Sequence, residues 1–196
     1  MLTVTTAALL LALDVTPAFA HLSPDEHGSF MAGFTHPLFG LDHILAMVAV
    51  GLWAAMLGGR AVWIVPSAFV GMMAVGFALA MSGIGLPFVE PAILASVVVL
   101  GLVIAAAIQL PAFAGAILVG AFAVFHGYAH GTELGAANAL PYLAGFAAAT
   151  VLLHAAGIGL GLALGSGLGA TTGRWAARAL GGATALLGLG LMTGAM

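Results

Sequence analysis

The chain has 196 residues, of which 63% are hydrophobic and only 5% are charged, with a mean hydropathy of +1.24. A soluble domain carries about a quarter charged residues, so this composition excludes a soluble protein and predicts an integral membrane protein. Three Lys and Arg residues exclude a nucleic-acid-binding surface, and the lack of cysteine excludes disulfides and thiolate ligands. Seven histidines against three basic residues indicate metal or proton chemistry.

Residues 1–20 have the pattern of a secretory signal peptide. The apolar run Ala7–Leu13 precedes the small-residue cleavage pattern Ala18-Phe19-Ala20. We expect cleavage after Ala20, although Asp14 interrupts the apolar stretch and the start of the chain carries no Lys or Arg. The alternative is a retained first membrane helix.

Residues 21–29 are expected to form a periplasmic N-terminal arm. After cleavage, the free α-amine and the His21 imidazole would make a chelating pair, with Asp25, Glu26 and His27 close behind. The arm is therefore either a loose metal-collecting segment or a merely polar tail.

Residues 30–196 are expected to form an all-α transmembrane domain of six helices. Each apolar segment reaches the length of about 20 residues that spans a bilayer, and short Pro- and Gly-rich gaps separate the segments. The connections are short, so sequential helices should be antiparallel neighbours. The segments run over 30–58, 62–83, 87–109, 111–132, 138–165 and 175–195.

The arginines predict the orientation in the inner membrane. Arg60 lies between the first two segments, and Arg174 and Arg178 lie between the fifth and sixth. With six spans these positions fall on one side, which the positive-inside rule makes cytoplasmic. The mature N-terminus is then periplasmic.

The first candidate site lies where the first segment begins. His36, Asp42 and His43 enter an apolar run, where an ionisable residue is costly and indicates function. If the segment is helical from His36, Pro37 suits the first turn, and the two histidines share one face. Alternatively, Pro37 and Gly40 mark an irregular stretch that lines a cavity. Either arrangement can point the three side chains toward the interior of the bundle. If the motif has no function, the alternative is that the two histidines lie at the membrane interface and the Asp caps a helix.

The second candidate site lies at the C-terminal end of the fourth segment. His126 and His130 are spaced i, i+4, which places them on one helical face and lets two imidazoles share one metal ion. Glu133 continues that face, either as a third ligand or as the acceptor that fixes a histidine tautomer. The alternative is a histidine that hydrogen-bonds to a backbone carbonyl across a helix interface.

His154 lies in the middle of the fifth segment, as a polar interhelical contact or as a relay. Together the candidate ligands are imidazoles and carboxylates, which suit Ni²⁺, Co²⁺ or Zn²⁺ and do not suit Cu(I). We expect the ion to be bound and transported cargo, with no prosthetic group.

The first motif resembles that of the HupE/UreJ family of nickel permeases and hydrogenase or urease accessory proteins, HPxxGxDHxxxMxxVG. All eight fixed positions match, at His36, Pro37, Gly40, Asp42, His43, Met47, Val50 and Gly51. The stretch from Phe125 to Glu133 resembles the second histidine motif of the family. The resemblance implies six helices, uptake of Ni²⁺ or Co²⁺, and a metal path through the residues of both motifs. It also implies an indirect link to the maturation of a hydrogenase or a urease.

The sequence therefore favours a permease for a divalent transition metal over an enzyme. An intramembrane zinc-dependent hydrolase is the alternative, and a proton channel or membrane metal sensor is a weaker one. The expected partners are the metal ion and the lipid bilayer, and a homo-oligomer stays open.

Overall fold

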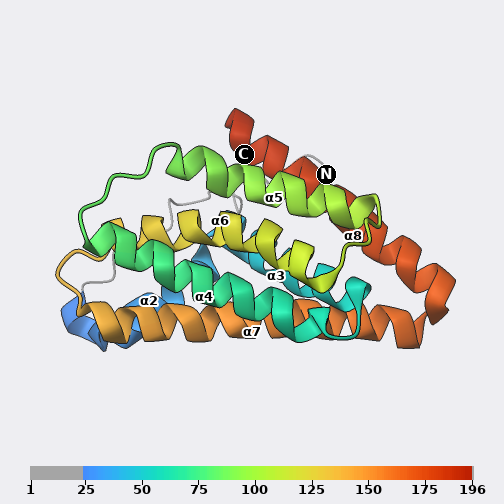
Figure 1. The fold of residues 1–196 in the computed structure, drawn as a ribbon, viewed down its shortest axis with the longest axis horizontal. Coiled ribbons are helices and arrows are strands. Elements are labelled where there is room, and N and C mark those ends of the chain that lie inside the picture. Colours follow the sequence, from blue (N-terminus) through green and yellow to red (C-terminus); the bar gives the residue numbers. More distant parts are fainter. Residues whose placement is uncertain (1–23, 196) are drawn as a thin grey trace, which may run out of the picture.

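The computed structural model describes residues 24–195, and all regular structure in that range is α-helical (Figure 1). The predicted signal peptide, residues 1–20, and His21 lie outside the described residues. The helices are α2 (Pro24–Phe39), α3 (Leu41–Leu57), α4 (Ala61–Met81), α5 (Val89–Ala105), α6 (Ala112–Thr132), α7 (Ala139–Gly167) and α8 (Gly169–Thr193). Helix α2 begins inside the predicted N-terminal arm.

Four of these helices, α4, α6, α7 and α8, are long and apolar enough to cross a membrane. A fifth span results if Ser29–Phe39 of α2 and α3 are counted as one broken span. Helix α5 is apolar but has only 17 residues, about 26 Å of helix. The chain is therefore an all-helical, multi-pass membrane protein, and each of the six predicted segments contains helix.

Of the two arrangements that the sequence left open for this stretch, a helix from His36 and an irregular stretch, the chain adopts the second and breaks at Gly40. Helices α2 and α3 meet at 83°, and Gly40 has extended backbone angles, φ −85° and ψ 116°. Pro37 lies in the last turn of α2, not in the first turn of a helix. A proline cannot donate a backbone hydrogen bond and glycine is a weak helix former, so the pair favours a helix end. The alternative of an irregular stretch is the one observed.

Close helix contacts in the bundle form through pairs of glycines. Gly51 of α3 lies against the backbone of His154, and Gly157 of α7 lies against that of Val48. The contacts are so close that a Cβ atom at either glycine would overlap a carbonyl oxygen of the other helix. Small residues allow this approach between membrane helices. The same reciprocal arrangement joins α2 to α7 through Gly33 and Gly145, and α4 to α6 through Gly76 and Gly127. Gly101 and Gly181 join α5 to α8 just as closely, but there a Cβ atom would come nearest to the backbone nitrogen of Ala185 and to the Ile104 side chain respectively.

Glycines recur every four residues from Gly157 to Gly169, but only the first two pack against α3. Gly157 and Gly161 pack against α3, whereas a Cβ at Gly165 or Gly169 would meet nothing within 4 Å. Gly165 instead lies beside α8, where a Cβ at Gly173 would come within 3.1 Å of its backbone nitrogen, and Gly169 is the first residue of α8.

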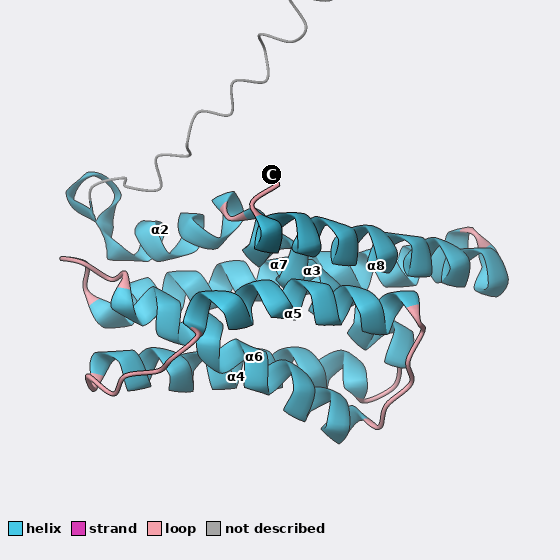
Figure 2. Cartoon of the chain, turned by 90° about the horizontal axis from the view of Figure 1, so that it is seen from above, coloured by secondary structure: helices cyan, strands magenta, loops and turns pink. Residues whose placement is uncertain are grey.

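The bundle has two distinct ends, because the helices α3 to α8 alternate in direction (Figures 1 and 2). Arg60 lies at one end, in the connection from α3 to α4. Arg174 and Arg178 belong to the same end, but they lie inside α8, which begins at Gly169 and not at the predicted residue 175. Arg178 donates a hydrogen bond of 2.7 Å from its Nε to the carbonyl of Ala105, at the C-terminus of α5.

Candidate metal centre

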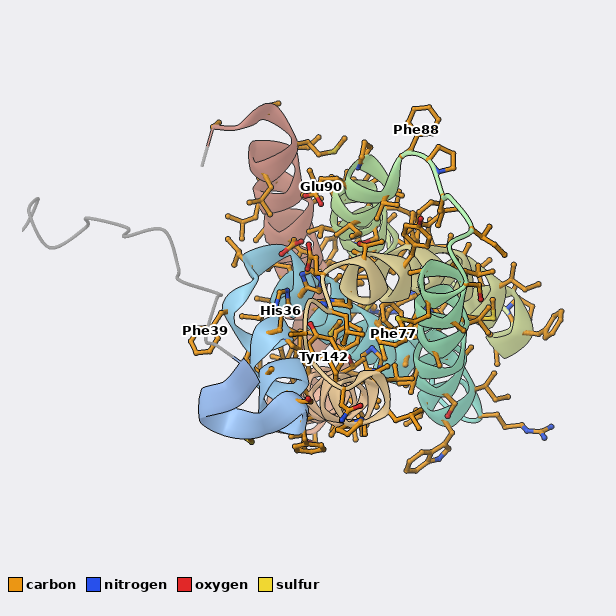
Figure 3. All side chains as sticks on the ribbon, turned by 90° about the vertical axis from the view of Figure 1, so that its left-hand side faces the viewer. His36, Phe39, Phe77, Phe88, Glu90 and Tyr142 are labelled. Atoms are coloured by element: carbon orange, nitrogen blue, oxygen red, sulfur yellow. The ribbon has the colours of Figure 1, made fainter. Side chains whose placement is uncertain are left out.

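The residues of both sequence motifs meet at the end of the bundle opposite the arginines, where Figure 3 labels His36. The last turn of α2 carries His36, and the first turn of α3 carries Asp42 and His43. The final turns of α6 carry His126 and His130, and Glu133 ends that helix. The fold thus brings together candidates that lie about ninety residues apart in the chain.

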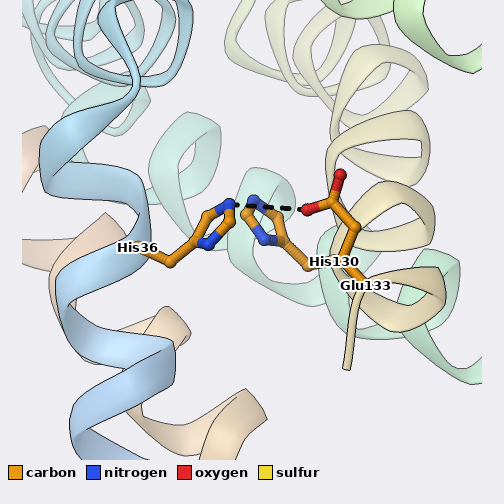
Figure 4. Close-up of side chains that lie close together, drawn as sticks. All are labelled: His36, His130 and Glu133. Carbon is orange, nitrogen blue, oxygen red and sulfur yellow. Dashed lines mark ion pairs between the residues drawn. The ribbon is translucent and has the colours of Figure 1, made fainter. Parts of the chain in front are cut away.

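Three side chains form the group best placed to hold one ion. His36, His130 and Glu133 each offer a ligand atom, and these atoms all lie within 4.8 Å of one another. The Nε2 atom of His36 is 3.4 Å from Oε2 of Glu133 (Figure 4). His130 is fully buried, whereas the Glu133 side chain is 56% exposed. An ion could therefore meet an accessible carboxylate first and buried imidazoles next.

A chain of polar contacts links this group to the motif on α3. Asp42 Oδ1 lies 3.0 Å from His43 Nδ1, and His43 Nε2 lies 2.8 Å from His130 Nε2. A carboxylate only accepts, so Nδ1 of His43 must carry the proton, which leaves a lone pair on Nε2 in the neutral ring. The Nε2–H of His130 then donates to that lone pair. Asp42 thus fixes the His43 tautomer in which Nε2 carries the lone pair, the tautomer found in carboxylate–histidine–metal arrangements.

Two aromatic residues of α7 complete the surroundings of His130. The hydroxyl of Tyr142 is 3.5 Å from Nδ1 of His130, and the ring of Phe146 lies 3.8 Å from the His130 ring, centre to centre. The sequence analysis missed both residues. Tyr142 is one of only two tyrosines, but no spacing rule connects it to a histidine on another helix.

His126 lies one turn deeper than His130. Its Nδ1 donates a hydrogen bond of 3.0 Å to the carbonyl of Phe122, so its Nε2 carries the lone pair. That Nε2 is buried and has no hydrogen-bond partner in the described part of the chain. The ring lies 5.3 Å from that of His43, centre to centre. His126 is not in the three-residue group, so the prediction that it shares an ion with His130 stays a prediction.

His154 is separate from the other histidines. The buried ring of Phe69, from α4, packs against both His154 and His126, with ring centres 5.1 Å and 5.4 Å away respectively. Met47, a fixed position of the first motif, is fully buried in the apolar core. Glu90, in the first turn of α5, lies at the same end of the bundle as His36 (Figure 3).

The geometry fits a divalent ion only after a small rearrangement. Two imidazole nitrogens bound to one tetrahedral ion are about 3.3 Å apart, because each bond is about 2.0–2.1 Å long. The 2.8 Å between His43 and His130 is a hydrogen-bond distance, so an ion that enters must replace this hydrogen bond. His130 would then move its proton to Nδ1, where the Tyr142 oxygen can accept it.

Comparison with known proteins places these residues in a family. The family model described as HupE / UreJ protein matches residues 8–191 of the chain. The chain belongs to the HupE/UreJ family. Protein HupE of Rhizobium leguminosarum bv. viciae is 51% identical over 194 residues, which cover 97% of each protein. No solved structure is detectably similar.

The HupE/UreJ motif on α3 has a structural reason for its glycine. A Cβ at Gly40 would lie 2.9 Å from both Asp42 Oδ1 and His43 Nδ1. Glycine at this position therefore allows both the bend between α2 and α3 and the close approach of the Asp42 and His43 side chains to the backbone.

Asp42→Asn is expected to weaken Ni²⁺ binding about 10- to 100-fold, the usual effect of losing the partner of a ligating histidine. Asparagine keeps the shape, but its neutral amide no longer favours the Nδ1–H tautomer of His43. Equilibrium dialysis of the purified protein with radioactive Ni²⁺ measures the change. The exposed neighbour Leu41, replaced by Ala, is the matched control. An affinity of Asp42→Asn within twofold of wild type would contradict this role.

Proposed function

We propose that this chain is a permease that moves a divalent transition metal, Ni²⁺ foremost and Co²⁺ next, across the inner membrane into the cytoplasm. The HupE/UreJ family is a family of nickel and cobalt permease-type accessory proteins. The observation that carries the proposal for this chain is the group formed by His36, His130 and Glu133 at one end of an apolar bundle. The imported ion would supply the maturation of a nickel enzyme, a hydrogenase or a urease.

Capture of the ion is the first step of the proposed mechanism. The exposed carboxylate of Glu133 attracts a hydrated cation and directs it to the His36 and His130 imidazoles. His43, oriented by Asp42, adds a further nitrogen as the ion loses water. A conducting site must bind strongly enough to remove water and weakly enough to release the ion. Imidazoles and carboxylates without thiolates meet both requirements for these metals.

The topology that we propose places this centre at the periplasmic mouth. Arg60, Arg174 and Arg178 lie at the opposite end, which the positive-inside rule makes cytoplasmic. A cleaved signal peptide, a periplasmic N-terminus and six spans complete the arrangement. In it, α5 is the shortest span, and the bent α2–α3 pair is a broken span that lines the mouth.

The zinc hydrolase considered from the sequence gains no support. The comparisons point to accessory proteins of metal transport, and no observation on the described residues favours a hydrolytic reaction. We therefore propose a single function.

Uptake of radioactive Ni²⁺ by cells that lack other nickel importers tests the proposal. Cells that produce the protein are expected to accumulate Ni²⁺ well above cells with an empty vector. Excess Co²⁺ should compete, because the same nitrogen and oxygen ligands suit both ions. Equal accumulation by the two strains for Ni²⁺, Co²⁺ and Zn²⁺ alike would reject the permease.

A further inference from the structure

The buried histidines of the metal centre differ in the group that their Nδ1 atoms face. Nδ1 of His43 faces a carboxylate at 3.0 Å, and Nδ1 of His126 faces a backbone carbonyl at 3.0 Å. Both of these groups only accept a hydrogen bond, so each keeps the ring proton on Nδ1. Nδ1 of His130 instead faces the hydroxyl of Tyr142, at 3.5 Å, and a hydroxyl both donates and accepts. Of these three rings, His130 is therefore the one whose partner allows either tautomer.

The surroundings of Tyr142 hold its hydroxyl beside His130. Tyr142 lies in the first turn of α7 and is 5% exposed. Its ring stacks on that of Phe77 from α4, with ring centres 6.3 Å apart and an angle of 23° between the planes (Figure 3). Phe146, one turn further along α7, packs against the His130 ring. Packing thus fixes the Tyr142 ring, while the hydroxyl hydrogen can still rotate.

His130 needs both tautomers if it is to bind an ion through Nε2. In the structure this atom donates a hydrogen bond of 2.8 Å to Nε2 of His43. An ion replaces this hydrogen bond only if Nε2 of His130 loses its proton, because the metal bond uses the lone pair. Water takes that proton and Nδ1 gains one from water, so the ring stays neutral and the number of protons is unchanged. The buried Nδ1–H then needs an acceptor, since an unpaired buried donor is costly.

The same exchange brings His130 closer to Tyr142. Two imidazole nitrogens bound to one ion lie about 3.3 Å apart, which is more than the 2.8 Å of the hydrogen bond. The two nitrogens of an imidazole point in nearly opposite directions, so a His130 ring that moves away from His43 moves its Nδ1 toward the hydroxyl. A metal-bound imidazole is also a stronger donor, because it carries part of the charge of the ion. Both effects strengthen the hydrogen bond between His130 and Tyr142 when the ion binds.

We propose that Tyr142 is a positioning residue of the metal centre, whose hydroxyl donates to Nδ1 of His130 before the ion binds and accepts from Nδ1–H afterwards. The inference rests on the proposed function and deepens it, because it assigns the step that turns a hydrogen-bonded pair of histidines into two ligands. When His43 and His130 release their hydrogen bond, each offers a lone pair to the same ion.

Tyr142→Phe tests this role, since it removes the hydroxyl and keeps the packing of the ring. Equilibrium dialysis of the purified protein with radioactive Ni²⁺ should show an affinity about 10-fold weaker than that of wild type, as for the loss of the partner of a ligating histidine. Tyr128→Phe is the matched control, because Tyr128 is the other tyrosine of the chain and lies two residues from His130, about 200° around α6. The control should bind Ni²⁺ like wild type.

X-ray absorption spectroscopy of the Ni²⁺-loaded proteins separates a positioning role from a merely structural one, because it counts the imidazole ligands of the ion. Wild type and Tyr128→Phe should show the imidazoles of His36, His43 and His130. Tyr142→Phe, loaded at saturating Ni²⁺, should show fewer imidazoles, because His43 and His130 stay bonded to each other.

The outcomes separate this inference from the proposed function. An affinity of Tyr142→Phe within twofold of wild type overturns the role of Tyr142, and so does a weaker affinity with an unchanged number of imidazoles. Both results leave the permease intact as long as cells with the wild-type protein accumulate Ni²⁺. A wild-type protein that binds Ni²⁺ through these imidazoles but does not accumulate it in cells contradicts the permease and leaves the role of Tyr142 at the metal centre standing.

Discussion

His130→Ala is expected to reduce Ni²⁺ uptake at least about 100-fold, because loss of even an outer-shell partner commonly changes metal affinity or activity 10- to 100-fold. His130 belongs to the three-residue ligand group, contacts His43, and lies beside Tyr142. The substitution therefore removes one ligand and leaves the His43 nitrogen without its hydrogen-bond donor. Uptake of radioactive Ni²⁺, normalised to the amount of protein in the membrane, measures the loss.

Thr132→Ala is the matched control for this variant. Thr132 lies in the same turn of α6, and its exposed hydroxyl bonds only to the carbonyl of Ala129 in its own helix. We expect this control to transport like wild type. Wild-type uptake by a folded His130→Ala variant would show that the ion does not pass through the centre described above.

Gly157→Leu is expected to prevent formation of a stable bundle. The Cβ atom alone would overlap the Val48 carbonyl of α3, and backbone cannot move aside as a flexible side chain can. Overpacking in a filled core costs about 1–3 kcal/mol and sometimes more, and here it would separate two helices along their contact. Size-exclusion chromatography and thermal unfolding in detergent should show little folded protein.

Gly159→Leu, two residues away on the same helix, tests whether the effect comes from the α3–α7 contact. A Cβ at Gly159 would meet nothing within 4 Å, so the leucine would point outward, where leucine suits a membrane helix. This variant should fold and melt like wild type. If both variants behave alike, the close contact of α3 with α7 is not what holds the bundle together.

The sequence alone predicted much of the secondary structure, for a plain physical reason. Long apolar runs with few charges form helices in a membrane, where each backbone polar group must be paired within its own segment. The six predicted segments accordingly contain helix. The helix boundaries within the first segment could not be predicted from the sequence, because Pro37 and Gly40 fit either the start of a helix or a break in one. The structure shows a break with an 83° bend, and α2 packs against α7 through Gly33 and Gly145.

In the candidate site, too, some features could be predicted from the sequence and others required the tertiary structure. The types of ligand and their local spacing were readable from the sequence, because residues such as His126 and His130 lie on one helical face wherever the helix goes. Partners on other helices were not readable. The contact of His36 with Glu133, and that of Tyr142 with His130, depend on how α2, α6 and α7 are placed.

The sequence by itself thus determined that this is a helical membrane protein with candidate imidazole and carboxylate ligands in two motifs. The tertiary structure alone decided that the motifs meet at one end of the bundle and that His126 lies deeper than His130. It alone showed that Phe69 packs against both His126 and His154. Local spacing fixes which residues share a face of one helix, but distances between helices are set by packing, here through glycine pairs that no single segment reveals.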